Sequence, residues 1–304
     1  MDCLSDLRAR GPQPDVGVEA MGLVRRSRDC PPVKRRVLLG ERDLKILRAI
    51  GRMQFATTAQ IRACFFSGAT ATVRRLGKLV ASGLLKVHVP CLAGENVYGL
   101  SAKGVDTVIA RCEADEEEIH RGTGAPRSGL AHAIAINDLR VALTLACRSD
   151  PQLSVELFLS DADLRRQTGA RVPPSIPDAL VVLVHGGRRL EWVVEIDLGT
   201  EPASFVAATK GRLWAALRER RASFFGLNRW QPLLLAPDLR RLRHLARALA
   251  TVGACDFVIA GLLPELSGSW VSGQGFAPLS GILARPEGEF PWTETLLSSR
   301  GRVC

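Results

Sequence analysis

The chain has 304 residues, enough for two domains of ordinary size, and 46% of them are hydrophobic, as in a folded globular protein. No apolar run is long enough to span a membrane, and the first residues lack the apolar stretch of a secretory signal. Eight cysteines are widely spaced without a CxxC pair, which argues against a zinc site and a disulfide framework. We therefore expect a cytoplasmic protein without a membrane partner.

The net charge of +10 is concentrated in the first third of the chain. Residues 1–110 hold 18 Lys/Arg against 9 Asp/Glu, and the remaining residues hold 23 against 22. A basic segment of this kind is typical of proteins that bind nucleic acid. A solvated tail that only aids solubility is the alternative.

Residues 1–37 contain four prolines and no periodicity, and we interpret them as a flexible basic arm. Periodicity and turn residues then predict three helices and two short strands around Gly94, at residues 44–50, 57–65, 68–81, 84–89 and 96–100. Three helices followed by a hairpin is the order of a winged helix-turn-helix domain. We place this domain at residues 38–111.

The third of these helices is expected to read the major groove of double-stranded DNA. With Val73, Leu76 and Val80 facing the core, five residues are expected to face DNA: Thr70, Thr72, Arg74, Arg75 and Lys78. Arginine suits guanine edges and phosphates, while lysine and threonine suit phosphates. The alternative is a three-helix packing module with a solvated basic face. Glu95 is an unusual residue for a wing that grips phosphate.

The second half of the chain predicts a mixed sheet with helices on its faces, and so an α+β or α/β fold. An acidic, then Gly/Pro-rich linker is expected at residues 112–129, and the second domain at residues 130–264. Its expected helices are at residues 131–147, 202–221 and 239–250, and its expected strands are at residues 153–159, 178–184, 189–197, 231–236 and 255–260. Residues 265–304 form a C-terminal extension for which the sequence pattern indicates no particular fold.

A hairpin in this second domain brings two acids together. If Gly186-Gly187 forms a tight turn, Asp178 lies directly opposite Glu195. Like charges about 5 Å apart across a sheet are destabilising, so something should offset the cost. A divalent metal held by oxygen ligands is the natural candidate.

Other acids extend this patch. Asp197 shares a strand face with Glu195. Asp138 lies in the apolar stripe of its helix, where an acid is costly unless it has a partner such as a nearby arginine. His132 lies off that stripe, and we assign it a surface or packing role.

The order of elements and acids resembles the PD-(D/E)xK nuclease superfamily, with Pro177-Asp178 as the "PD" and Glu195-Ile196-Asp197 in the place of "(D/E)xK". The resemblance implies that Asp178 and Glu195 bind Mg²⁺, or Mn²⁺ as a substitute, with Asp197 and Asp138 as further ligands. Asp197 stands where the catalytic lysine belongs. Lys210 is the candidate for a migrated lysine, which would make Asp178, Glu195 and Lys210 the catalytic set. The alternative is a domain that has lost catalysis.

Over residues 40–220 the chain also resembles the replication-relaxation family of plasmid and mobile-element proteins. Four segments carry this resemblance: Tyr98-Gly99-Leu100-Ser101, Asn137-Asp138-Leu139-Arg140, Pro177-Asp178-Ala179 and Glu195-Ile196-Asp197-Leu198-Gly199-Thr200-Glu201. It implies a winged helix before a restriction-endonuclease-like domain, and a DNA-binding protein of replication or mobilisation. A second domain that nicks or cleaves DNA is what the PD-(D/E)xK resemblance implies. Replication or mobilisation proteins are the implied protein partners, and a homodimer is a further candidate because winged-helix proteins are often dimers. A non-catalytic DNA-binding regulator is the alternative, and a ligand-sensing repressor is a third reading.

Overall fold

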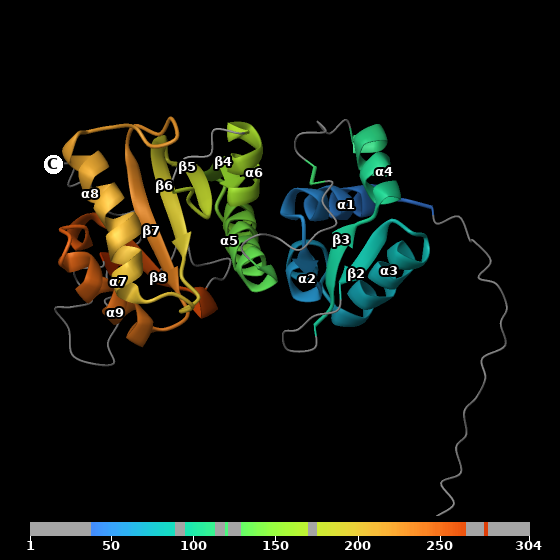
Figure 1. Ribbon diagram of the computed structural model, residues 1–304. Helices are drawn as coiled ribbons and strands as arrows, with labels where there is room; N and C mark the ends of the chain where they lie inside the picture. The colour runs from blue at the N-terminus through green and yellow to red at the C-terminus, as the bar shows by residue number, and fades with distance from the viewer. Residues whose placement is uncertain are drawn as a thin grey trace, which may run out of the picture. The chain divides into compact units, whose positions relative to one another are not determined.

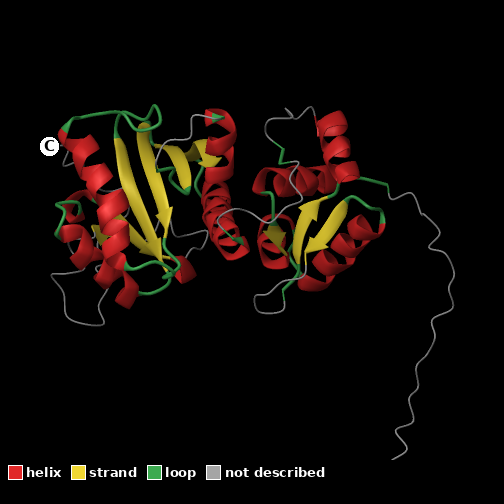
Figure 2. Ribbon diagram, in the orientation of Figure 1, coloured by secondary structure: helices red, strands yellow, loops and turns green. Residues whose placement is uncertain are grey.

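The computed structural model describes residues 38–88, 95–112, 119–120, 129–169, 175–265 and 277–278. These residues all belong to one unit of the chain, which begins at Arg36. The predicted basic arm, the turn at Gly94, most of the linker and most of the C-terminal extension lie outside the described residues. The predicted α+β class is confirmed, because helices accompany a three-stranded and a six-stranded sheet (Figures 1 and 2).

The first part of the described chain contains the three predicted helices and the two predicted strands in their predicted order, and a short strand that was not predicted precedes the second helix. Its elements are α1 (Glu41–Met53), β1 (Ala56–Thr57), α2 (Thr58–Phe65), α3 (Ala69–Ala81), β2 (Leu85–His88), β3 (Val97–Leu100) and α4 (Ala102–Cys112). Strand β3 pairs with both β2 and β1 in an antiparallel sheet. This arrangement is compatible with a winged helix-turn-helix domain.

Local sequence signals account for the boundaries of α2 and α3. The Thr57 hydroxyl accepts a hydrogen bond from the Gln60 amide at 3.1 Å, and the Gln60 side chain accepts one from the Thr57 amide at 3.0 Å. These reciprocal bonds form a capping box that begins α2. Just beyond the end of α3, Gly83 has a φ of +73°, a left-handed conformation that favours glycine.

The second part of the described chain forms the larger sheet and its helices. The helices are α5 (Leu130–Ser149), α6 (Asp161–Thr168), α7 (Ala203–Val206), the π-helical turn η2 (Ala207–Gly211), α8 (Arg212–Glu219) and α9 (Leu239–Ala250). The strands are β4 (Leu153–Ser160), β5 (Ala179–His185), β6 (Arg188–Ile196), β7 (Trp230–Ala236), β8 (Ile259–Leu262) and β9 (Ala277–Pro278). They lie in that order across the sheet; β6–β7 and β7–β8 are parallel, and the other pairs are antiparallel.

Helices cover both faces of this sheet, and the alternation of buried residues along β5 shows how (Figure 1). Leu180 and Val182 pack in the cluster that contains α8 and α9, while Val181 and Leu183 pack in the cluster that contains α5. Because successive side chains of a strand point to opposite faces, a strand buried on both sides reads as a continuous apolar run. The sheet is thus the middle layer of three.

Three details differ from the sequence prediction. Helix α6 occupies a stretch in which no helix or strand was predicted. Ser160 caps its N-terminus, because the Ser160 hydroxyl accepts a hydrogen bond from the Asp163 amide. The last predicted strand starts later, at Ile259, because Cys255–Phe257 form a short 3₁₀ turn. The helix predicted at 202–221 is interrupted in its middle by the π-helical turn η2.

Helix α5 is long and apolar enough, by length and composition alone, to cross a membrane. It packs in this structure as a core helix, with Leu139 and Leu143 buried against the sheet. Polar residues interrupt its apolar sequence at Asn137, Asp138 and Arg140. The four cysteines that the structure describes are free thiols.

Candidate functional site

The hairpin of β5 and β6 has the predicted register. Gly186 and Gly187 form its two-residue turn with φ values of +54° and +78°, the left-handed conformations that such a turn requires. The Asp178 amide donates to the Val194 carbonyl at 3.0 Å, and Oδ2 of Asp178 accepts a hydrogen bond from the Ile196 amide at 2.7 Å. Asp178 therefore lies beside Glu195, the residue between these two partners.

Lys210 reaches this pair of acids from the helix that follows the hairpin. Its Nζ donates to Oε2 of Glu195, whose side chain is 5% exposed. Lys210 lies within η2, and a π-helical turn shifts the side chains that follow it around the helix axis. A Cβ at the neighbouring Gly211 would lie 2.6 Å from Cδ2 of Leu249, so glycine is what allows η2 to pack against α9.

His132 joins the site from α5, and the surface or packing role that we predicted for it is wrong. Its Nε2 lies 2.8 Å from Oδ1 of Asp178, close enough for an ion pair with the protonated imidazole. The residue spacing on the helix could not indicate this contact, because it depends on how α5 packs against the start of β5. We call His132, Asp178, Glu195 and Lys210 the carboxylate centre.

Burial and mutual charge set the protonation of the carboxylate centre. Burial raises the pKa of Glu195 well above its usual range, against the opposing effect of Lys210, and the charge of Asp178 acts in the same direction as burial. Burial alone would also raise the pKa of Asp178, but His132 and Lys210 hold it below its usual range. Burial opposes the charged forms of His132 and Lys210, but the carboxylates raise the pKa of both. The two acids therefore differ in proton affinity.

Asp197 does not belong to this centre, and the prediction that it joins the acid patch is wrong. Both of its carboxylate oxygens accept hydrogen bonds from Arg241 of α9, each at 2.7 Å. Arg241 also donates to the carbonyl of Glu201. Since β6 ends at Ile196, the strand alternation that predicted a shared face stops before Asp197.

Asp138 is likewise not part of the carboxylate centre, which corrects its prediction as a metal ligand. Its Oδ1 accepts a hydrogen bond of 2.7 Å from the Gln60 side chain of α2. Next to it, the Asn137 side chain donates to the carbonyls of Met53 and Phe55. Asp138 does need a polar partner, as its apolar neighbours predict, but the partner is a glutamine amide.

Asp161, the first residue of α6, is an acid near the centre that the sequence prediction omitted. Its amide donates to the Asp178 carbonyl at 2.8 Å. Burial, and then the charge of Asp178, raise the pKa of Asp161. The spacing Ser160-x-x-Asp163 is a capping-box signal and could have placed a helix here, with Asp161 at its start.

The arrangement of the carboxylate centre limits which metal could bind. Within the described part of the chain, no three His, Cys, Asp or Glu residues are grouped as a metal site. Two buried carboxylates are nevertheless a suitable donor set for Mg²⁺, which keeps several waters and commonly uses only one or two carboxylates. Asp178 and Glu195 are the residues that could hold such an ion, and their catalytic roles with Lys210 stay predictions.

Two of the five residues predicted to face DNA from α3 are not free to do so. Thr72 is fully buried, and its hydroxyl donates to the Gly68 carbonyl at 2.8 Å. Nε of Arg75 donates to Oδ1 of the buried Asp43 at 2.6 Å, and Arg75 Nη2 also contacts that carboxylate. Val73, predicted to be in the core, is instead 55% exposed. The face of α3 that packs into the core is therefore rotated by one residue position relative to the predicted face.

The other three residues predicted to face DNA, Thr70, Arg74 and Lys78, are exposed. With Val73 and Gly77 between them, they form one face of the helix, which we call the α3 face. Glu95, unusual for a phosphate-gripping wing, accepts a hydrogen bond from the Ala59 amide at 2.5 Å. It therefore serves the N-terminus of α2, where the helix dipole favours a carboxylate.

Comparison with known proteins places the chain in a family. No curated protein and no solved structure matches it. The model of the family described as replication-relaxation matches residues 47–223, which is more than half of the chain and includes both α3 and the carboxylate centre. The chain therefore belongs to the replication-relaxation family, which suggests a role in replication or mobilisation.

Proposed function

We propose that the protein binds double-stranded DNA through the α3 face and nicks or cleaves DNA at the carboxylate centre with Mg²⁺. The observation that carries the proposal is the contact of Lys210 Nζ with Glu195, beside Asp178. Two acids and a lysine are the set of the PD-(D/E)xK nucleases that the sequence resembles, here with the lysine supplied by a helix in place of the strand. The metal would activate water and neutralise charge that develops on the phosphate.

Each residue of the carboxylate centre has a distinct role in this proposal. Asp178 and Glu195 would hold the metal. Lys210 would orient the attacking water or stabilise the developing negative charge, in the way that positioned cations do. His132 is a positioning residue, because its contact with Oδ1 fixes the Asp178 side chain from one side while the Ile196 amide fixes Oδ2.

We expect the protein to nick supercoiled plasmid in the presence of Mg²⁺ or Mn²⁺. Asp178→Ala and Glu195→Ala should each lower the rate by at least about 100-fold, because each removes a metal ligand. The rate is measured from the conversion of supercoiled to open-circular DNA on a gel. Glu219→Ala is the matched control, since this acid is exposed at the end of α8 and belongs to neither the carboxylate centre nor its neighbours. Equal nicking by the parent and both centre variants would exclude catalysis at this centre.

We expect Arg74→Gln combined with Lys78→Gln to weaken binding of double-stranded DNA. If each residue contacts one phosphate, the slope of log K against log salt should become shallower by about 1.8. Fluorescence anisotropy of a labelled duplex across a salt series measures both the affinity and the slope. Lys45→Gln combined with Arg111→Gln is the control, because it makes the same charge change at exposed positions on α1 and α4. A slope as steep as that of the control would exclude the α3 face.

A non-catalytic DNA-binding regulator is the second candidate. It is favoured by the engagement of Asp197 by Arg241 and of Asp138 by Gln60, which leaves two of the four acids predicted as ligands. Such a protein would bind DNA but leave plasmid intact with either metal. As a homodimer, or together with other replication or mobilisation proteins, it would act by occupying its site.

A further inference from the structure

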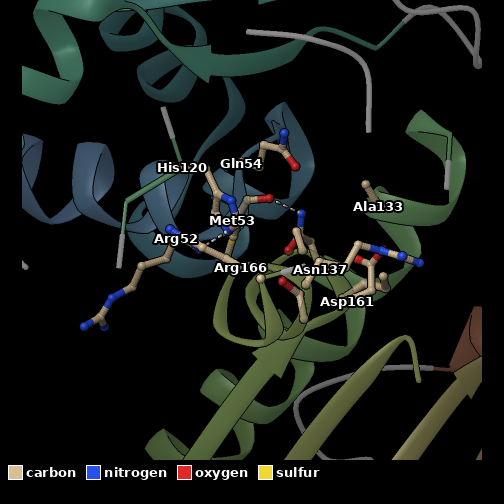
Figure 3. A pocket seen from close by; sticks show the side chains of 13 residues that line it. Arg52, Met53, Gln54, His120, Ala133, Asn137, Asp161 and Arg166 are labelled. Atoms are coloured by element: carbon tan, nitrogen blue, oxygen red, sulfur yellow. Dashed lines mark hydrogen bonds and ion pairs between the residues drawn. The ribbon is translucent and has the colours of Figure 1, made fainter. Parts of the chain in front are cut away.

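Two hollows in the surface of the protein have two arginines in common. One has a volume of about 370 Å³ and the other about 970 Å³, and Arg52 and Arg166 line both. Arg165 and His120 line the smaller hollow, and Arg140 lines the larger one. In Figure 3, Arg166 lies beside His120, and the Arg52 side chain extends away from Asp161. We call the two hollows together the arginine groove.

The smaller hollow of the arginine groove is lined by two residues that adjoin the carboxylate centre. Asp161 lines the smaller hollow, and its amide donates to the carbonyl of Asp178. Ala133 lines the same hollow and directly follows His132. A chain that lies in the groove would therefore be separated from Asp178 by Asp161, whose backbone is bonded to it.

Asp161 and Asp163 do not use all of the hydrogen-bond donors of Arg140, Arg165 and Arg166. Asp163 is within 4 Å of Arg166, Arg140 and His120, with its nearest contact to Arg166 Nη2 at 2.6 Å. Its two oxygens offer about four acceptor sites, whereas each guanidinium carries five N–H donors. Asp161 lies 3.8 Å from Arg165 Nε, and that buried nitrogen has no hydrogen-bond partner within the described structure.

Arg140 is the most enclosed of these arginines. Its guanidinium carbon lies 4.1 Å from the centre of the Phe158 ring, and its Nε is buried without a hydrogen-bond partner among the described residues. Burial lowers the pKa of Arg140 to about 10, so it stays charged at neutral pH. A buried charge with spare donors is costly unless an anion completes its contacts.

We propose that the arginine groove binds the sugar–phosphate backbone of a DNA strand and leads it to Asp178 and Glu195. The planar, multiply donating guanidinium group is the side chain best suited to phosphate oxygens. The inference rests on the proposed function and adds a second DNA contact, separate from the α3 face.

The groove is tested by replacing the two arginines that its hollows share. The Arg52→Gln/Arg166→Gln protein should bind a labelled oligonucleotide about tenfold more weakly, with a salt slope shallower by about 1.4 for single strands. Arg240→Gln/Arg247→Gln is the matched control, because it removes two exposed arginines from α9. A parent protein that does not bind DNA would overturn both the groove and the proposed function. Normal affinity and slope in the groove variant, with binding lost in the α3-face variant, would overturn the groove alone.

A crosslinking experiment locates the bound DNA strand while all of the arginines of the groove stay in place. Gln167 is exposed and lines the larger hollow, so a photoreactive phenylalanine analogue placed there should crosslink to bound DNA. The same analogue at the exposed His244 of α9 should not. Crosslinking from both positions to the same extent, or from neither, would overturn the inference.

Discussion

Replacing Lys210 with methionine is expected to destabilise the protein by about 3 kcal/mol at pH 8, because it leaves the buried Glu195 carboxylate without its cation. The free energy of unfolding is measured by urea titration. The double variant Lys210→Met/Glu195→Gln should recover more than half of the loss, since it removes both charges. An unchanged free energy of unfolding in Lys210→Met would contradict the ion pair.

The effect of Lys210→Met should depend on pH in a defined direction. The pKa of Glu195 in the folded protein is already raised by burial, and removing Lys210 raises it further. A group whose pKa is higher in the folded than in the unfolded state loses stability as pH rises between the two values. The loss should therefore be smaller at pH 5 than at pH 8. Equal losses at both would show that Glu195 stays ionised.

Lys45→Met provides the control for Lys210→Met. Lys45 Nζ lies 2.6 Å from Glu41 on the surface of α1, and both side chains are mostly exposed. Solvent screens such a pair, so its loss should leave stability nearly unchanged at either pH. A larger loss of stability in Lys210→Met than in Lys45→Met would show that burial makes the Lys210–Glu195 ion pair important for stability.

The sequence predicted the positions of Asp178 and Glu195 because both follow from local rules. The Gly186-Gly187 turn determines the register of the hairpin, and the register places the two acids together. Lys210 could be named only as a candidate. Its approach to Glu195 depends on the π-helical turn η2 and on the packing of Gly211 against Leu249, which periodicity does not reveal.

Three of the wrong site predictions, those for Asp197, Asp138 and Arg75, share one cause: each side chain is bound by a partner distant in sequence. Arg241 lies 44 positions after Asp197, and Gln60 lies 78 positions before Asp138. Arg75 is bound by Asp43, 32 positions before it. A single sequence shows that an acid or an arginine needs a partner, but not which of several partners the tertiary fold brings near.

Gly104→Ala is expected to destabilise the first part of the chain by about 3 kcal/mol, although alanine is the better helix former. A Cβ at this position of α4 would lie 2.1 Å from the carbonyl oxygen of Leu84. The same carbonyl accepts a hydrogen bond from the Ser101 amide, and the Ser101 hydroxyl accepts one from the Gly104 amide. Because the obstacle is backbone tied to the start of α4, it cannot move aside as a side chain would.

Gly77→Ala separates this steric effect from helix propensity. Gly77 also lies within a helix, but a Cβ there would have no atom within 4 Å. Alanine should therefore stabilise α3 by about 1 kcal/mol. Both variants are compared with the parent by thermal and urea unfolding. If Gly104→Ala were as stable as Gly77→Ala, α4 could not pack against Leu84 as described, and the hairpin that follows α3 would have a different support.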